Sequence, residues 1–206
     1  MSTRKKWMSW GADIQKIPPA RTMVYLFMAG SALLFVTLLF AHAVLIGFRL
    51  FDGQYSRLPR AFVLSTLVLS AGTLLLRNLK PLFSGGRLPL LVQRLTLACS
   101  AGLLFAVLQV WGWFGLYRLN QTEPFLSREW TLIGLVSALH LLHLIGAFAL
   151  LVYQTAYFYR KMKDPAGEVI VLADPYYYER IRTLAIFWFY TDFIWVFIFL
   201  YFLAAL

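Results

Sequence analysis

Acidic side chains are scarce in this chain, and cysteine is almost absent. Nine Asp and Glu residues stand against nineteen Lys and Arg residues, which gives a formal net charge of +10. The only cysteine, Cys99, lies within an apolar run, so neither an intrachain disulfide nor a cysteine-based metal cluster can form. The sequence also offers no nucleophile–base pair and no phosphate-binding loop. We therefore expect no catalytic centre on this chain.

Apolar residues are abundant instead. They make up 61% of the 206 residues, and mean hydropathy is +0.70. Soluble proteins are usually about 45–50% apolar, so this composition indicates an integral membrane protein. The basic residues lie mostly between the apolar runs, where membrane topology accounts for them. Nucleic-acid binding is therefore not expected.

Five apolar runs are candidates for membrane spans. A spanning backbone must satisfy its own hydrogen bonds, so helices are expected rather than open strands. We predict an all-α bundle with a basic interfacial segment at 1–21 and transmembrane helices at 22–48, 61–76, 88–117, 130–157 and 183–206. The second run has only 16 residues, so its flanking arginines would have to extend to the interface.

The distribution of basic residues predicts the orientation of the bundle. If the N-terminus is cytoplasmic, thirteen Lys and Arg residues fall in inside segments and five in outside segments, while Arg94 lies within the third run. Positively charged segments favour the cytoplasmic side. The sequence therefore predicts a cytoplasmic N-terminus and a C-terminus outside, with the long connection 160–182 also cytoplasmic. In that connection, Asp164-Pro165 and Asp174-Pro175 are expected to mark turns.

The last run contains one carboxylate, Asp192, which needs a partner because a charge at that depth is costly. His140 and His143 lie on one face of the fourth run, and helix rise puts them in the same inner-to-middle depth range as Asp192. We hypothesise that Asp192 accepts a hydrogen bond from one of these histidines. A packing role for the carboxyl and a role in proton handling both stay open. A metal or heme site is not expected, because the remaining histidine, His42, lies in the opposite half of the membrane.

Two segments resemble motifs of a known family. The segment 138–146, with His140 and His143, resembles the H-x-x-H-x-x-G motif of subunit III of heme–copper oxidases, the family of cytochrome c oxidase subunit III. The segment 188–195 resembles that family's closing W-H-F-x-D-x-x-W pattern, with Trp188, Asp192 and Trp195 in place. In the family this pattern also lies on the last helix.

Weaker likenesses lie in the other runs. Leu58-Pro59 followed by Ser65-Thr66 resembles the family's L-P…N-T segment, and Gln109 resembles the glutamine of its Q-x-x-E motif. The chain departs from the family at three places. Gly30-Ser31 replaces a Ser-Glu pair, Gly112 stands at the glutamate of Q-x-x-E, and Phe189 stands at the histidine of W-H-F. The resemblance therefore indicates a divergent five-helix form.

The resemblance implies an accessory, cofactor-free subunit of a respiratory terminal oxidase in the bacterial cytoplasmic membrane. Such a subunit packs on catalytic subunit I, holds phospholipid in an interhelical cleft and supports stability and proton uptake, while heme and copper belong to partner subunits. The buried polar cluster and cleft would then involve His140, His143, Asp192, Trp188, Trp195 and Gln109. Arg160 resembles the family's lipid-headgroup arginine, although setting the topology explains it equally well.

Two other functions remain compatible with the sequence. One is the equivalent subunit of a quinol oxidase or of a nitric oxide reductase-associated complex. The other is a small proton-coupled carrier in which Asp192 and the histidine pair form a relay.

Overall fold

The computed structural model describes residues 19–48, 60–77, 79–119 and 128–205. Within these ranges the chain forms helices and no strand. The elements are α2 (Pro19–Leu45), α3 (Arg60–Leu75), α4 (Leu79–Ser84), α5 (Leu88–Leu119), α6 (Arg128–Met162), α7 (Pro165–Ala173) and α8 (Pro175–Ala205). In the described part of the chain, five spans are long and apolar enough to cross a membrane, as predicted. Most of the basic segment 1–21 and all of Leu58-Pro59 lie outside the described residues.

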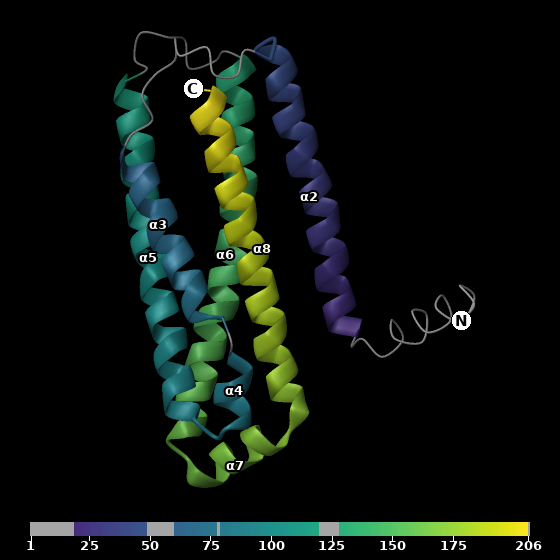
Figure 1. Ribbon diagram of the computed structural model, residues 1–206, viewed down its shortest axis with the longest axis vertical. Helices are drawn as coiled ribbons and strands as arrows, with labels where there is room; N and C mark the ends of the chain where they lie inside the picture. Colours follow the sequence, from purple (N-terminus) through teal and green to yellow (C-terminus); the bar gives the residue numbers. More distant parts are fainter. Residues whose placement is uncertain (1–18, 49–59, 78, 120–127, 206) are drawn as a thin grey trace, which may run out of the picture.

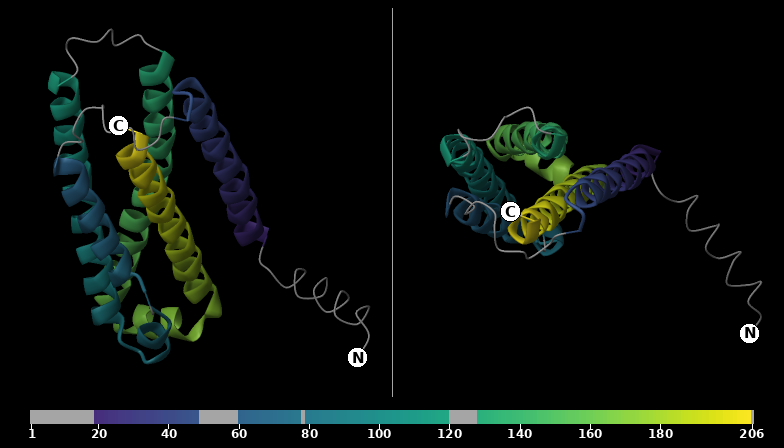
Figure 2. Two further views of the ribbon diagram at one scale, coloured as in Figure 1. Left: turned by 45° about the horizontal axis from the view of Figure 1, so that its top comes forward. Right: turned by 90° about the horizontal axis from the view of Figure 1, so that it is seen from above.

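The long spans form an up-and-down bundle (Figure 1). Helices α2, α5 and α8 run in one direction and α3 and α6 in the other, while the short helices α4 and α7 lie together at one end. Helix α2 packs against α6 and α8 at the edge of the bundle, and α3 packs along α5 (Figure 2). Only 17% of the most apolar window of the first span is buried, against 41% in the second, so α2 offers most of its surface to the membrane.

The second span is longer than the sequence indicated. Helix α3 matches the predicted run, but α4 continues the span to Ser84 and buries Leu79, Leu82 and Phe83. The chain then turns through Gly86, whose positive φ of 66° is readily adopted by glycine. The span therefore covers 25 residues, and the short run does not depend on arginines reaching the interface.

The Asp-Pro pairs begin helices, contrary to the expectation of simple turns. The Asp164 carboxylate accepts a hydrogen bond from the Ala166 N–H at 3.2 Å, and the Asp174 carboxylate accepts one from the Tyr176 N–H at 2.9 Å. Each proline occupies the first helical position, where its missing N–H costs nothing. As a result α7 fills part of the predicted connection, and α8 begins at Pro175 rather than at 183.

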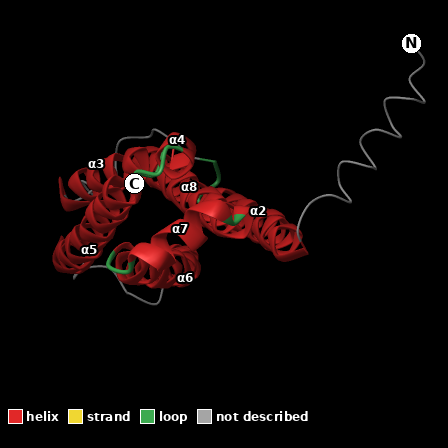
Figure 3. Cartoon of the chain, turned by 90° about the horizontal axis from the view of Figure 1, so that it is seen from below, coloured by secondary structure: helices red, strands yellow, loops and turns green. Residues whose placement is uncertain are grey.

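Small residues bring the helix backbones close together. A Cβ on Gly72 of α3 would lie 2.8 Å from the Ala101 Cβ on α5. A Cβ on Gly102 would lie 3.0 Å from the Phe148 ring of α6 and 3.2 Å from the Trp188 ring of α8. Contacts between small residues and large rings are typical of helix association in membranes. Seen from below, α3, α5, α6 and α8 are arranged around the bundle, and α2 lies outside them beside α8 (Figure 3).

Candidate functional site: a polar seam between α3 and α8

Three polar contacts join α3 to α8. They form one line of hydrogen bonds, which we call the α8 seam: Trp195 Nε1 donates to Thr66 Oγ1 at 3.0 Å, Ser70 Oγ donates to Asp192 Oδ1 at 3.4 Å, and Trp188 Nε1 donates to Thr73 Oγ1 at 3.0 Å. The Thr73 hydroxyl itself donates to the Leu69 carbonyl of its own helix at 3.0 Å. The carboxyl predicted to need a partner therefore has the Ser70 hydroxyl as its hydrogen-bond donor.

Residue spacing explains why the seam forms. On each helix the three residues follow one another at intervals of four and three, which places them on one face. Because α3 and α8 are antiparallel, the order along one helix is the reverse of the order along the other. Each indole N–H thereby obtains an acceptor inside the bundle, where an unpaired donor would be costly.

The predicted hydrogen bond between Asp192 and a histidine is not formed, and that hypothesis was wrong. The His140 ring nitrogens and His143 Nε2 have no hydrogen-bond partner among the described residues, while His143 Nδ1 donates to the Leu139 carbonyl at 2.8 Å. Asp192 faces α3, whose Ser70 supplies the donor instead. Within the described ranges, Asp192 also takes part in no ion pair.

The two histidines pack among aromatic rings of α2 and α8. The His140 ring lies 5.0 Å from the Trp195 ring, and the His143 ring lies 5.0 Å from the Phe27 ring and 5.3 Å from the Phe35 ring, all measured between centroids. His140 is 3% exposed and His143 5%. The histidine face predicted from the sequence therefore contacts the α8 seam through Trp195 rather than through the carboxyl.

Gln109 joins α5 to the same region. Its Nε2 donates to Ser65 Oγ at 2.8 Å, and Ser65 in turn donates to the Phe62 carbonyl at 2.9 Å. Ser65 is next to Thr66 of the α8 seam. The structure thus brings together residues from α3, α5, α6 and α8 that the sequence singled out separately.

Helices α2 and α8 are joined by a parallel series of polar contacts that the sequence analysis missed. Ser31 Oγ lies 2.7 Å from Tyr190 Oη, and His42 Nδ1 lies 2.7 Å from Tyr201 Oη. The two pairs are eleven residues apart on each helix, which is about three helical turns and keeps both on one face. Ser31 and His42 could have been matched with tyrosines of the last run by this spacing.

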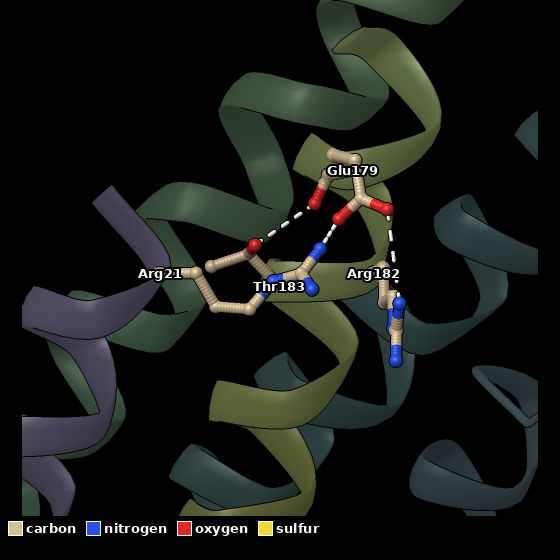
Figure 4. A network of polar contacts seen from close by, with 4 residues as sticks. All are labelled: Arg21, Glu179, Arg182 and Thr183. Atoms are coloured by element: carbon tan, nitrogen blue, oxygen red, sulfur yellow. Dashed lines mark hydrogen bonds and ion pairs between the residues drawn. The ribbon is translucent and has the colours of Figure 1, made fainter. Parts of the chain in front are cut away.

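An ion pair lies at the end of this series (Figure 4). The buried guanidinium of Arg21 contacts the carboxylate of Glu179, which Arg182 approaches from the other side at 3.7 Å. Thr183 Oγ1 also donates to the Glu179 carbonyl at 2.8 Å. In the sequence analysis Arg21 counted only as one of the basic residues that indicate membrane orientation. The contact between Arg21 and Glu179 was therefore not predicted.

The ion pair lines a cavity of about 400 Å³ between α2, α6 and α8, which Gln154 and Arg180 also line. Arg160, the predicted headgroup arginine, lies exposed in the last turn of α6 and is not among the residues that line this cavity. Its proposed role in lipid binding stays a prediction.

The described residues contain no group of three or more His, Cys, Asp or Glu side chains placed to hold a metal ion. Comparison with protein-family models and with curated proteins gave no match. The geometry of the α8 seam and its neighbours is therefore the basis for the functional argument.

The Trp188 hydrogen bond is a testable element of the seam. Thr73→Val should lower the free energy of unfolding by about 1–3 kcal/mol, because it leaves a buried indole N–H without its acceptor. Reversible unfolding in mixed detergent micelles, followed by circular dichroism, measures the change. Thr37→Val is the matched control, since the Thr37 hydroxyl is exposed and bonds only within its own helix. Equal effects of the two substitutions would show that the Trp188 bond contributes nothing.

Proposed function

We propose that this chain is an accessory, cofactor-free subunit of the subunit III type in a respiratory terminal oxidase. It packs beside the catalytic subunit in the bacterial cytoplasmic membrane and holds phospholipid between its helices. The end that carries α4 and α7 is cytoplasmic in this proposal, because the connections at that end carry most of the basic residues outside the spans. Heme and copper lie on partner subunits.

One observation carries the proposal. The motif residues that resemble the family are separated by up to 130 positions in the sequence, yet they form one connected cluster. Gln109 bonds Ser65, Thr66 bonds Trp195, and Trp195 packs on His140. These contacts bring the segments that carry the resemblance together in one region of the bundle. The cluster thus supports a common arrangement of helices behind the resemblance.

The polar groups of the cluster are suited to holding helices together. The indoles of the α8 seam donate hydrogen bonds to its hydroxyl groups, so few of these groups are free to bind a substrate or transfer a proton. A proton-coupled carrier would need a relay between Asp192 and the histidine pair. Within the described residues no hydrogen bond connects them, so the geometry favours the accessory subunit over the carrier.

Purification from native membranes tests the proposal. The tagged full chain, extracted in mild detergent, should carry with it chains that show heme bands in a reduced-minus-oxidised spectrum. The same chain expressed alone should show no such bands. Asp192→Asn should affect assembly at most and leave the heme spectrum of the complex intact, because the amide still offers an oxygen to Ser70 and heme lies on partner subunits in this proposal. A chain that purifies alone, transports a substrate into vesicles and loses transport in Asp192→Asn would refute the proposal and establish the carrier.

A further inference from the structure

A second cavity lies between α5 and α6, and His140 is one of the residues that line it. Its volume is about 350 Å³, and it is lined mainly by apolar and aromatic residues, among them Phe105, Val110, Trp113 and Leu141. Val110 and Leu141 are exposed at its edge, so the cavity opens toward the membrane rather than toward water. A ligand that reaches it through the bilayer has to be lipid-soluble.

Two of the few polar side chains of this cavity, His140 and Ser137, lack hydrogen-bond partners among the described residues. His140 is 3% exposed, lines the cavity and has no hydrogen-bond partner for either ring nitrogen among the described residues. Ser137 Oγ, one turn away on the same helix wall, is also buried and unpartnered. Buried polar atoms in proteins nearly always have a hydrogen-bond partner, so these atoms indicate a missing ligand group.

The Gln109 amide completes the polar side of the cavity. Its Nε2 is fixed by Ser65 Oγ, so the side chain is held in one orientation at the wall. Among the described residues, no Lys, Arg, Asp or Glu lines the cavity. An apolar pocket with a few convergent hydrogen-bonding groups, located between bundle helices, is typical of small-molecule sites.

We propose that the α5–α6 cavity binds a quinone or quinol ring. Such a ligand is uncharged and lipid-soluble, its flat ring suits the Phe105 and Trp113 walls, and its carbonyl or hydroxyl oxygen pairs with His140 and Ser137. The imidazole can donate or accept, so both redox forms can be held. The proposal concerns binding alone, and it stands whether or not the chain belongs to an oxidase.

The test uses the full chain in phosphatidylcholine nanodiscs, with decylubiquinone as the probe. Quinone binding should quench tryptophan fluorescence in a saturable way, and the saturable part should become smaller in Trp113→Phe, since Trp113 lines the cavity while Trp195 remains close to His140. Gly134→Leu should abolish binding by filling the cavity. A Cβ at Gly134 meets no atom of the described residues within 4 Å, so the added side chain begins in open space beside the cavity.

Gly30→Leu is the matched control. A Cβ at Gly30 also has nothing within 4 Å, but this glycine lies on α2, away from the cavity, so binding should be unchanged. His140→Phe and Ser137→Ala should each weaken binding, His140→Phe by about tenfold, because each removes a hydrogen bond and keeps most of the cavity shape.

Three results would overturn the proposal. They are non-saturable quenching by decylubiquinone in the wild-type chain, equal affinity in Gly134→Leu and Gly30→Leu, and displacement of the quinone by dioleoylglycerol at equal concentration. The last result would assign the cavity to a neutral lipid. Full retention of the quinone in the presence of dioleoylglycerol supports the quinone assignment.

Discussion

Gly102→Val should destabilise the bundle by about 2–3 kcal/mol, because the added isopropyl group overpacks a site between three helices. The added Cβ would meet the Phe148 ring at 3.0 Å and the Trp188 ring at 3.2 Å. These rings come from α6 and α8, so neither can withdraw without disturbing its own helix contact. Movement of Trp188 would also break its hydrogen bond to Thr73 and open one end of the α8 seam.

Unfolding in mixed micelles measures the effect, and Gly30→Val is the matched control. The change from glycine to valine alters intrinsic helix propensity in the same way at both positions, but at Gly30 no atom of the described residues lies within 4 Å of the new Cβ. The difference between the two variants therefore reports the packing alone. If both variants unfold at the same detergent fraction, the close contact of α5 with Phe148 and Trp188 does not exist as described.

Glu179→Gln should lower the free energy of unfolding by about 2–3 kcal/mol. It removes the carboxylate and leaves the Arg21 guanidinium, whose side chain is 9% exposed, without an opposite charge. Breaking a buried pair typically costs about 3–5 kcal/mol, and the 31% exposure of Glu179 reduces that value. Arg21→Met should cost less, because Arg182 still faces Glu179 at 3.7 Å.

The double variant Arg21→Met with Glu179→Gln tests whether the two residues act as a pair. It should recover at least half of the loss seen in Glu179→Gln, since no isolated charge is left buried. Arg160→Met, at an exposed arginine of the same end of the bundle, is the control and should change stability by less than about 0.5 kcal/mol. Additive losses in the double variant would show that Arg21 and Glu179 do not interact.

The spans were predictable because a long apolar run in a membrane must satisfy its own backbone hydrogen bonds, and an α-helix does so within one segment. The helix bounds at the end of the bundle that carries α4 and α7 could not be predicted in this way. Asp-Pro signals a turn and a helix start equally well, and only the carboxylate contacts to Ala166 and Tyr176 distinguish the two. Helix α4 was missed because it has only six residues and contains a proline, which disfavours a helix at internal positions.

The candidate site was harder to predict, for a related reason. The sequence correctly indicated that Asp192 needs a partner, but α8 is apolar on every side, so periodicity does not say which face meets α3 and which meets α6. The contact between α3 and α8 could have been predicted from residue spacing. Thr66, Ser70 and Thr73 have the same intervals as the three polar residues of α8 that they contact. Matching hydroxyl positions between runs would have found the seam.

Removal of the chain from the proposed oxidase complex, after purification, tests the accessory role most directly. Oxygen consumption is followed over many turnovers, with heme content measured before and after removal. The account predicts unchanged heme content and an unchanged initial rate, followed by earlier loss of activity in the complex that lacks the chain. Heme that leaves together with the chain, or an equal catalytic lifetime with and without it, would contradict the account.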